Sequence, residues 1–122
     1  MNVIPTSLEE LIKQFSKLPG IGRKTAERLS LYILKANSED VYEFSDTLKY
    51  LKNNIKTCVL CHCFIEGDIC SLCQDRQKNL LCIVSDPTDV FLIDKSGYNG
   101  TYHVLGGLIS PLDGITPENL NI

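Results

Sequence analysis

Four of the six cysteines form two pairs that could hold a metal ion. Cys58 and Cys61 make one Cys-x2-Cys pair, and Cys70 and Cys73 make a second after eight intervening residues. Each pair can direct both sulfur atoms to one Zn²⁺, and four thiolates complete a tetrahedron without leaving a position for substrate. The spacing therefore predicts one structural zinc ion. A redox dithiol is the alternative, and the absence of a thioredoxin-like βαβ context disfavours it.

The neighbouring His62 and Cys63 are expected to lie outside the metal coordination shell, because Cys61 and Cys63 are too close in sequence for the usual turn. Cys82 lies in an apolar run and is interpreted as a buried core thiol.

The segment from Leu18 to Leu29 contains a Pro-Gly-Ile-Gly turn followed by basic residues. A turn through Gly20, Ile21 and Gly22 between two helices leaves backbone N–H groups free at the start of the second helix, where they can bind an anion. Lys24 and Arg28 are four residues apart, so they share one helix face. The pattern is typical of sequence-independent binding to the DNA backbone. The alternative is a tight helical turn whose basic residues are merely solvated.

Acidic residues follow the apolar run Leu80–Val84, where a strand would end. Asp86 and Asp89 could bind a cation at the edge of a sheet, but capping of the next helix is the favoured interpretation. His103 is interpreted as a half-buried strand residue, because no carboxylate or nucleophile is evidently paired with it.

Composition and charge limit the possible classes of protein. The chain has 122 residues, of which 43% are hydrophobic and 22% charged, as in globular proteins. No apolar run approaches the roughly 20 residues of a membrane span, and the N-terminus lacks the features of a secretory signal, so a cytoplasmic location is expected. Residues 1–57 have nine basic and seven acidic side chains (+2), whereas residues 58–122 have three and eight (−5). A surface that binds anions should therefore lie in the first half.

Hydrophobic periodicity predicts the elements that position these residues. Helices are expected at 6–18, where Ser7 and Glu10 have capping-box spacing, at about 23–35, and from an N-cap at Ser38. The third has an apolar stripe of Val41, Phe44, Leu48, Leu51 and Ile55. Residues 57–75 lack periodicity and have too few aliphatic residues for a core, so something other than a hydrophobic core must hold them together. A strand buried on both faces at 80–84, a helix and a second strand at 102–105 predict the start of a parallel α/β sheet.

We therefore expect an α+β protein of several modules: a helical domain at 1–56, a four-cysteine zinc finger at 57–76 and an incomplete α/β domain at 77–122. Two parallel strands do not make a stable sheet, so the chain is interpreted as part of a longer protein or as one cut short.

Taken in order, these pieces resemble the RecR family of bacterial recombinational repair proteins. The resemblance covers essentially the whole chain, and the run Tyr-His-Val-Leu-Gly-Gly-Leu-Ile-Ser-Pro-Leu-Asp-Gly-Ile at 102–115 is peculiar to that family. It implies a helix-hairpin-helix domain, a zinc finger and a Toprim domain. It also implies ring-like clamps on DNA that act with RecO, and in some organisms RecF, to load the RecA recombinase at gapped DNA near the nucleoid.

Carried over by position, Gly20, Ile21, Gly22, Lys24 and Arg28 match the DNA-contacting motif of the family, and the four paired cysteines match its zinc ligands. For this chain we expect a dimer through the N-terminal domain rather than the full tetrameric ring, because RecR chains continue beyond the part that corresponds to Ile122.

No enzymatic activity is expected. Toprim enzymes hold Mg²⁺ with a glutamate at the end of the first strand and an Asp-x-Asp pair, whereas this chain has Ser85 at the first position and no Asp-x-Asp. The alternatives to a DNA-binding repair mediator are a zinc-containing adaptor for proteins with weak DNA contact, and a fragment without function.

Overall fold

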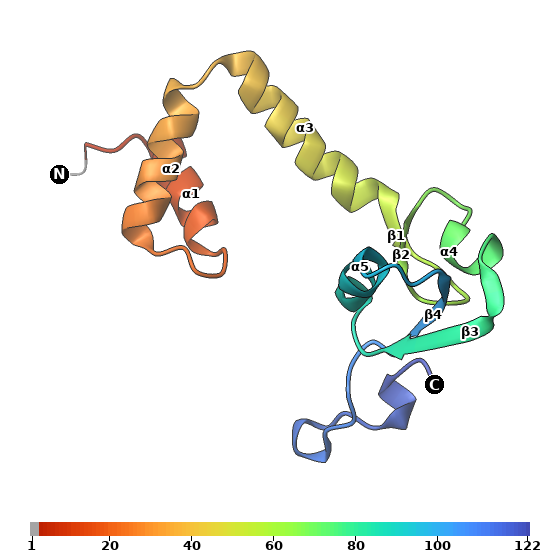
Figure 1. Ribbon diagram of the computed structural model, residues 1–122. Coiled ribbons are helices and arrows are strands. Elements are labelled where there is room, and N and C mark those ends of the chain that lie inside the picture. Colours follow the sequence, from red (N-terminus) through yellow and green to blue (C-terminus); the bar gives the residue numbers. More distant parts are fainter. Residues whose placement is uncertain (1–2) are drawn as a thin grey trace. The chain divides into compact units, whose positions relative to one another are not determined.

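The computed structural model describes residues 3–122, which form two compact units divided between Tyr50 and Leu51 (Figure 1). Three helices, α1 (Thr6–Ser16), α2 (Arg23–Lys35) and most of α3 (Ser38–Asn54), make up the first unit. The second unit contains all the described strands, and the α+β fold class expected from the sequence is confirmed. No helix within residues 3–122 is long and apolar enough to cross a membrane.

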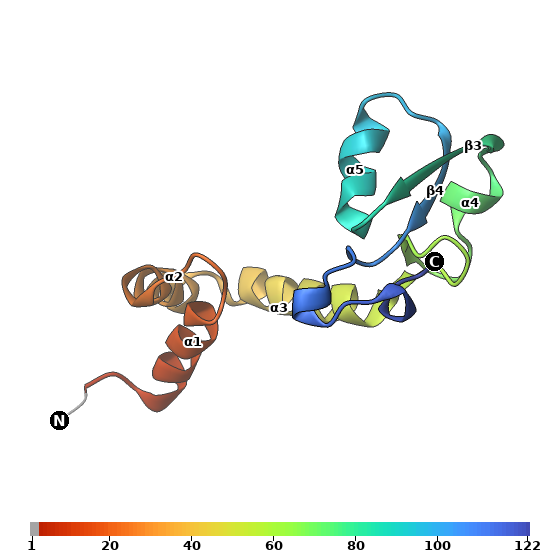
Figure 2. The same ribbon diagram turned by 90° about the horizontal axis from the view of Figure 1, so that it is seen from below.

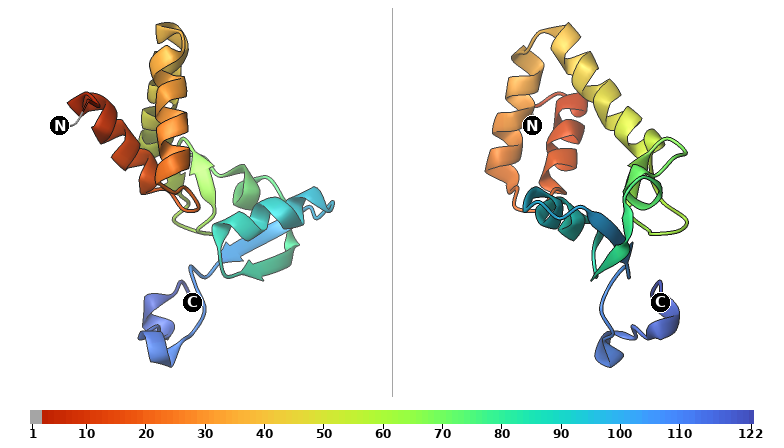
Figure 3. Two further views of the ribbon diagram at one scale, coloured as in Figure 1. Left: turned by 90° about the vertical axis from the view of Figure 1, so that its left-hand side faces the viewer. Right: turned by 45° about the vertical axis from the view of Figure 1, so that its right-hand side comes forward.

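Helices α1 and α2 pack against each other as a hairpin in the first unit (Figure 3). Ile12 of α1 is buried, and the small side chains of Ala26 and Ser30 are fully buried on α2, which lets the two helices approach closely. The observed α2 has the predicted bounds, but α1 ends at Ser16, before Leu18. The predicted capping box is wrong, because Pro5 occupies the N-cap of α1 and no side chain caps that end.

Helix α3 begins at Ser38, and Asn37 caps it by accepting a 2.8 Å hydrogen bond from the Glu39 N–H. The predicted apolar stripe is present but is not covered. Among its residues Phe44, Leu48 and Leu51 are each about half exposed, and α3 contains no buried residue. The stripe therefore forms a partly exposed apolar surface.

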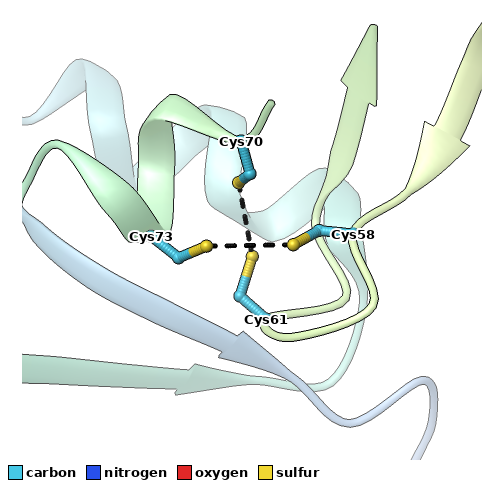
Figure 4. A group of neighbouring side chains, drawn as sticks. All are labelled: Cys58, Cys61, Cys70 and Cys73. Atoms are coloured by element: carbon cyan, nitrogen blue, oxygen red, sulfur yellow. Dashed lines mark hydrogen bonds between the residues drawn. The ribbon is translucent and has the colours of Figure 1, made fainter. Parts of the chain in front are cut away.

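A short hairpin opens the second unit. Strand β1 (Ile55–Thr57) pairs antiparallel with β2 (Phe64–Glu66), and the single-turn helix α4 (Ser71–Gln74) follows. Figure 4 shows that the β1–β2 turn and α4 face each other across the cysteine side chains. Because so few aliphatic residues are present, these cysteines supply most of the buried side chains of this segment.

A βαβ unit completes the second unit. Strand β3 (Gln77–Val84) runs parallel to β4 (Gly100–Val104), and α5 (Pro87–Lys95) connects them (Figure 2). Val84, Val90, Tyr102 and Val104 are buried in one core cluster together with Cys58, Cys61, Cys63 and Cys70. The cysteine-containing segment 57–76, called the metal module below, and the sheet thus share a core.

The apolar run at 80–84 forms a strand as predicted, but the prediction that both faces are buried is wrong. Leu80 is 50% exposed, and Leu81 and Ile83 are each 60% exposed. The reason is that β3 pairs only with β4 and leaves its other edge and part of its faces uncovered within the described residues.

Beyond β4 the chain forms a loop with two 3₁₀ turns, Pro111–Asp113 and Pro117–Asn119, and returns to the strand. The Asn121 N–H donates to the Leu105 carbonyl at 2.9 Å, and the Asn121 side-chain amide donates to the Val104 carbonyl at 3.2 Å. His103 is half-buried, with Nε2 2.5 Å from the Asn121 carbonyl oxygen. The loop therefore has fixed ends, and His103 helps to fix them.

Candidate metal centre and nucleic-acid interface

The turn between α1 and α2 positions the first group of predicted site residues. Gly20 has a φ of +79°, in the left-handed region that favours glycine. Gly22 is the N-cap of α2 and has an extended backbone, and no side-chain hydrogen bond caps this helix end. The first N–H groups of α2 thus have no partner of their own in the helix. Apart from its two chain neighbours, no atom of the described residues lies within 4 Å of a Cβ added at Gly22, so an outside ligand can approach this backbone closely.

Two cations lie beside this open helix end. Lys24 and Arg28 are exposed on the first turns of α2, and within residues 3–122 neither side chain forms an ion pair. Ile21, between the two glycines, is half-buried and its N–H donates to the Leu18 carbonyl at 3.2 Å. The turn therefore places the residues proposed to contact DNA in one short segment, at a helix end that attracts anions.

Arg23 was not singled out by the sequence, although it lies between Gly22 and Lys24. Its guanidinium donates to both carboxylate oxygens of Glu9, at 2.7 and 2.9 Å, and to Glu27 at 2.9 Å. The hydrogen bonds from Arg23 lower the pKa of Glu9. Arg23 therefore links α1 to α2 and shares its charge with two carboxylates, whereas Lys24 and Arg28 form no ion pair within residues 3–122.

The predicted metal ligands come together from two elements of the second unit. Cys58 and Cys61 lie in the β1–β2 turn, while Cys70 is the N-cap of α4 and Cys73 lies within it (Figure 4). All four sulfur atoms are within 4.8 Å of one another. The Sγ atoms of Cys58 and Cys73 are 3.8 Å apart, and those of Cys61 and Cys70 are 3.6 Å apart.

These distances fit a tetrahedral zinc site. With Zn–S bonds of about 2.3 Å, the sulfur atoms of an ideal tetrahedron lie about 3.8 Å apart. His62 and Cys63 lie outside the group of four, although Cys63 is buried beside it. Thiolate sulfur is the preferred donor for zinc, and four such ligands leave no open coordination position. The cluster can thus hold a metal ion and stabilise the fold around it.

The thiols differ in how readily they lose a proton. Burial raises the pKa of Cys58, but hydrogen bonds from the backbone N–H groups of Cys61 and Leu60 outweigh it and lower the value to about 7. Burial raises the pKa of Cys61 and raises that of Cys73 to about 11. A bound cation would favour the thiolate form of all four side chains.

Polar contacts join the metal module to the sheet. The Val104 N–H donates to the Cys61 carbonyl at 2.9 Å, and Arg76, just after α4, forms two hydrogen bonds with Asp94 of α5. The Tyr102 hydroxyl donates to the same carboxylate at 3.0 Å. The hydrogen bonds from Arg76 and from Tyr102 lower the pKa of Asp94. The four cysteines are therefore connected to β4 by a backbone hydrogen bond, and the segment after α4 is connected to α5 by the side chains of Arg76 and Asp94.

The two acids after β3 cap α5, as the sequence interpretation favoured. The Asp86 carboxylate accepts from the Thr88 N–H at 2.8 Å, and Asp89 accepts from the Asp86 N–H at 3.3 Å, which completes a capping box. Hydrogen bonds from Thr88 lower the pKa of Asp86. Ser85 contributes a hydroxyl 3.4 Å from Asp89. Both carboxylates are thus already bonded to the protein.

Two family models match the chain on either side of the cysteine segment. Residues 8–51 match a model described as RecR, helix-hairpin-helix, and residues 79–122 match a model of the Toprim domain. The chain is also 42% identical, over 125 residues, to the Recombination protein RecR of Desulfatibacillum aliphaticivorans. That alignment covers 100% of this chain and 63% of the relative, so the chain spans less than two thirds of the relative's length.

Proposed function

This chain belongs to the RecR family, and we propose that it is a DNA-binding protein of recombinational repair with no catalytic activity of its own. The observation that carries the proposal is the pair of exposed cations Lys24 and Arg28, which form no ion pair in the described part of the chain, beside the start of α2, where no described side chain provides a cap. Backbone N–H groups and basic side chains bind phosphate oxygens without reading bases. The contact is therefore with the DNA backbone and is independent of sequence.

Further partners are proposed from the family. RecO, and in some organisms RecF, would act with this protein to load RecA at gapped chromosomal DNA, at the nucleoid. A dimer through the N-terminal helices would supply two hairpins to one DNA molecule, and the partly uncovered apolar stripe of α3 offers surface for such pairing.

The proposed cofactor is one structural Zn²⁺ held by Cys58, Cys61, Cys70 and Cys73. The sulfur spacing and the shared core support this assignment. The metal would fix the turn that presents the Cys61 carbonyl to the Val104 amide. Its contribution is to stability, because four protein ligands exclude substrate from the ion.

The absence of catalysis is proposed from the residues at the end of β3. Ser85 stands where Toprim enzymes have a glutamate, and Asp86 and Asp89 are engaged in the capping box of α5. Carboxylates used in this way are poorly placed to bind Mg²⁺, because their oxygens already accept backbone hydrogen bonds. Magnesium-dependent nicking of plasmid DNA by the purified chain would contradict this part of the proposal.

The proposed function is tested by titrating the metal-loaded chain into two fluorescently labelled duplexes of unrelated sequence. Equal affinity for both, falling steeply as salt rises, is expected from contacts to the backbone. A strong preference for one sequence, or affinity that does not depend on salt, would contradict backbone recognition.

A protein-binding adaptor is the second candidate. The charge of −5 on residues 58–122 and the exposed Leu80, Leu81 and Ile83 favour a protein surface over phosphate in that part of the chain. The adaptor predicts little or no duplex binding in the titration, together with complex formation with RecO in size-exclusion chromatography.

A further inference from the structure

A groove in the second unit is lined by none of the residues of the two sites described above. It has a volume of about 480 Å³ and is open to solvent. The end of α3, the β1–β2 hairpin and α5 contribute its walls. The side chains that give it chemical character are Leu51, Lys52, Lys56, Phe64 and Phe91.

The two aromatic rings of the groove are accessible. Phe64 on β2 is 41% exposed and Phe91 on α5 is 51% exposed. Within residues 3–122 neither ring stacks on another aromatic side chain. Burial of these rings by a ligand would therefore remove apolar surface from water at two points.

Among the described residues that line the groove, the two charged side chains are both basic, Lys52 and Lys56. Lys52 is exposed and forms no ion pair in the described part of the chain. The Lys56 ammonium lies 3.0 Å from a carboxylate oxygen of Asp68, whose side chain is 90% exposed. An ion pair so exposed contributes little to stability, so a phosphate can compete with Asp68 for Lys56. The groove thus favours an anionic ligand with flat apolar parts.

We propose that this groove binds unpaired bases of single-stranded DNA, which stack on Phe64 and Phe91 while Lys52 and Lys56 contact the adjoining phosphates. Exposed aromatic rings combined with basic side chains are the features by which proteins bind single strands without sequence preference. Duplex DNA cannot use the rings, because its bases are already stacked and paired. The inference rests on the proposed function in that both sites take DNA, but it assigns the recognition of single strands to residues that the hairpin does not include.

A tryptophan reporter tests the stacking directly, because the chain contains no tryptophan. The Phe91→Trp variant of the metal-loaded full chain is titrated with oligothymidine, and saturable quenching of the indole fluorescence is expected. An oligomer of the same length and charge without bases should leave the fluorescence unchanged. The matched control is Leu92→Trp, which places the indole on the same helix at a side chain that is 71% exposed and does not line the groove. It should show no quenching.

Affinity measurements separate stacking from general apolar contact. Phe64→Leu combined with Phe91→Leu keeps apolar bulk but removes both rings, so affinity for oligothymidine should fall at least about fivefold. The matched Phe64→Tyr and Phe91→Tyr pair should retain it. Affinity for duplex DNA and for the base-free oligomer should be unchanged in both.

Three outcomes would overturn the proposal. The first is equal quenching of the two tryptophan variants. The second is an affinity for oligothymidine that the leucine pair retains. The third is that the leucine pair loses as much affinity for the base-free oligomer as for oligothymidine. If the leucine pair retained its affinity for oligothymidine, an apolar protein segment would be the remaining candidate ligand of the groove. Failure of the backbone-binding hairpin is distinguishable, because it would appear as absent duplex binding while the quenching of Phe91→Trp persists.

Discussion

Replacing Lys24 and Arg28 by alanine should weaken duplex binding through the salt-dependent part of the affinity. Both side chains are exposed beside the start of α2, and neither is neutralised by a carboxylate within residues 3–122. Each phosphate contact contributes about 0.9 to the slope of log K against log salt concentration. Loss of two contacts should therefore reduce the slope by about 1.8. Between 1 M and 0.1 M salt, the affinity of the variant should therefore rise about 60-fold less than that of the unmodified chain, which corresponds to about 2.5 kcal/mol of binding free energy.

The measurement is fluorescence anisotropy of a labelled duplex at several salt concentrations. The matched control removes two positive charges elsewhere in the first unit, with Lys35→Ala and Lys49→Ala, which lie at the end of α2 and on α3. The control should change the slope much less. The same change in both double variants would show that net charge, and not the hairpin, governs binding. An unchanged slope in the first variant would refute the phosphate contact and support the adaptor.

Three further predictions concern stability. Ser30→Ala should raise the free energy of unfolding by about 1 kcal/mol, because the fully buried hydroxyl has no hydrogen-bond partner among the described residues. The control Ser16→Ala loses a 2.9 Å hydrogen bond to the Ile12 carbonyl and should bring no gain. A lower free energy of unfolding for Ser30→Ala in urea would contradict this expectation. Arg23→Ala should destabilise the first unit only slightly, because its ion pairs are exposed; a double-mutant cycle with Glu9→Gln measures the coupling, and a large coupling energy would contradict this expectation. Chelation of the metal should speed hydrogen exchange at the Val104 amide, with α2 amides as reference, and unchanged exchange would refute the coupling through Cys61.

The metal cluster and the hairpin were predictable because their signals are local. The four cysteines fall within sixteen residues, and the Cys-x2-Cys turn fixes the directions of their side chains whatever surrounds them. Gly20 needs a left-handed backbone that few other residues adopt, so its place in the turn could be inferred without tertiary information. The capping of α5 by Asp86 and Asp89 was also predictable, because an N-cap and the third residue of a helix interact directly.

Burial could not be predicted in the same way. The apolar residues of Leu80–Val84 and of the stripe on α3 indicate that these segments are able to pack against another element. The sequence of each segment does not say which element that is, or whether it is present. The role of Arg23 was missed for a related reason. The pair of Arg23 with Glu27, four residues away on the same helix, could be inferred from the sequence. Glu9 becomes a neighbour of Arg23 only when α1 and α2 pack against each other. The error at the start of α1 has a different cause. Ser7 and Glu10 have the spacing of a capping box, but the N-cap position of the helix is occupied by Pro5.

The closeness of the metal ligands in sequence has a consequence for the order of events during synthesis on the ribosome. The proposed site is complete once residue 73 has emerged, whereas β4 and its pairing with β3 require the chain as far as Val104. Contacts over short sequence separations form faster than distant ones, because less loop entropy is lost. A nascent chain that has captured its metal would therefore already present the Cys61 carbonyl when Val104 appears. The cysteine module would then serve as a template for the later strand, and cells short of metal would accumulate chains whose sheet forms late.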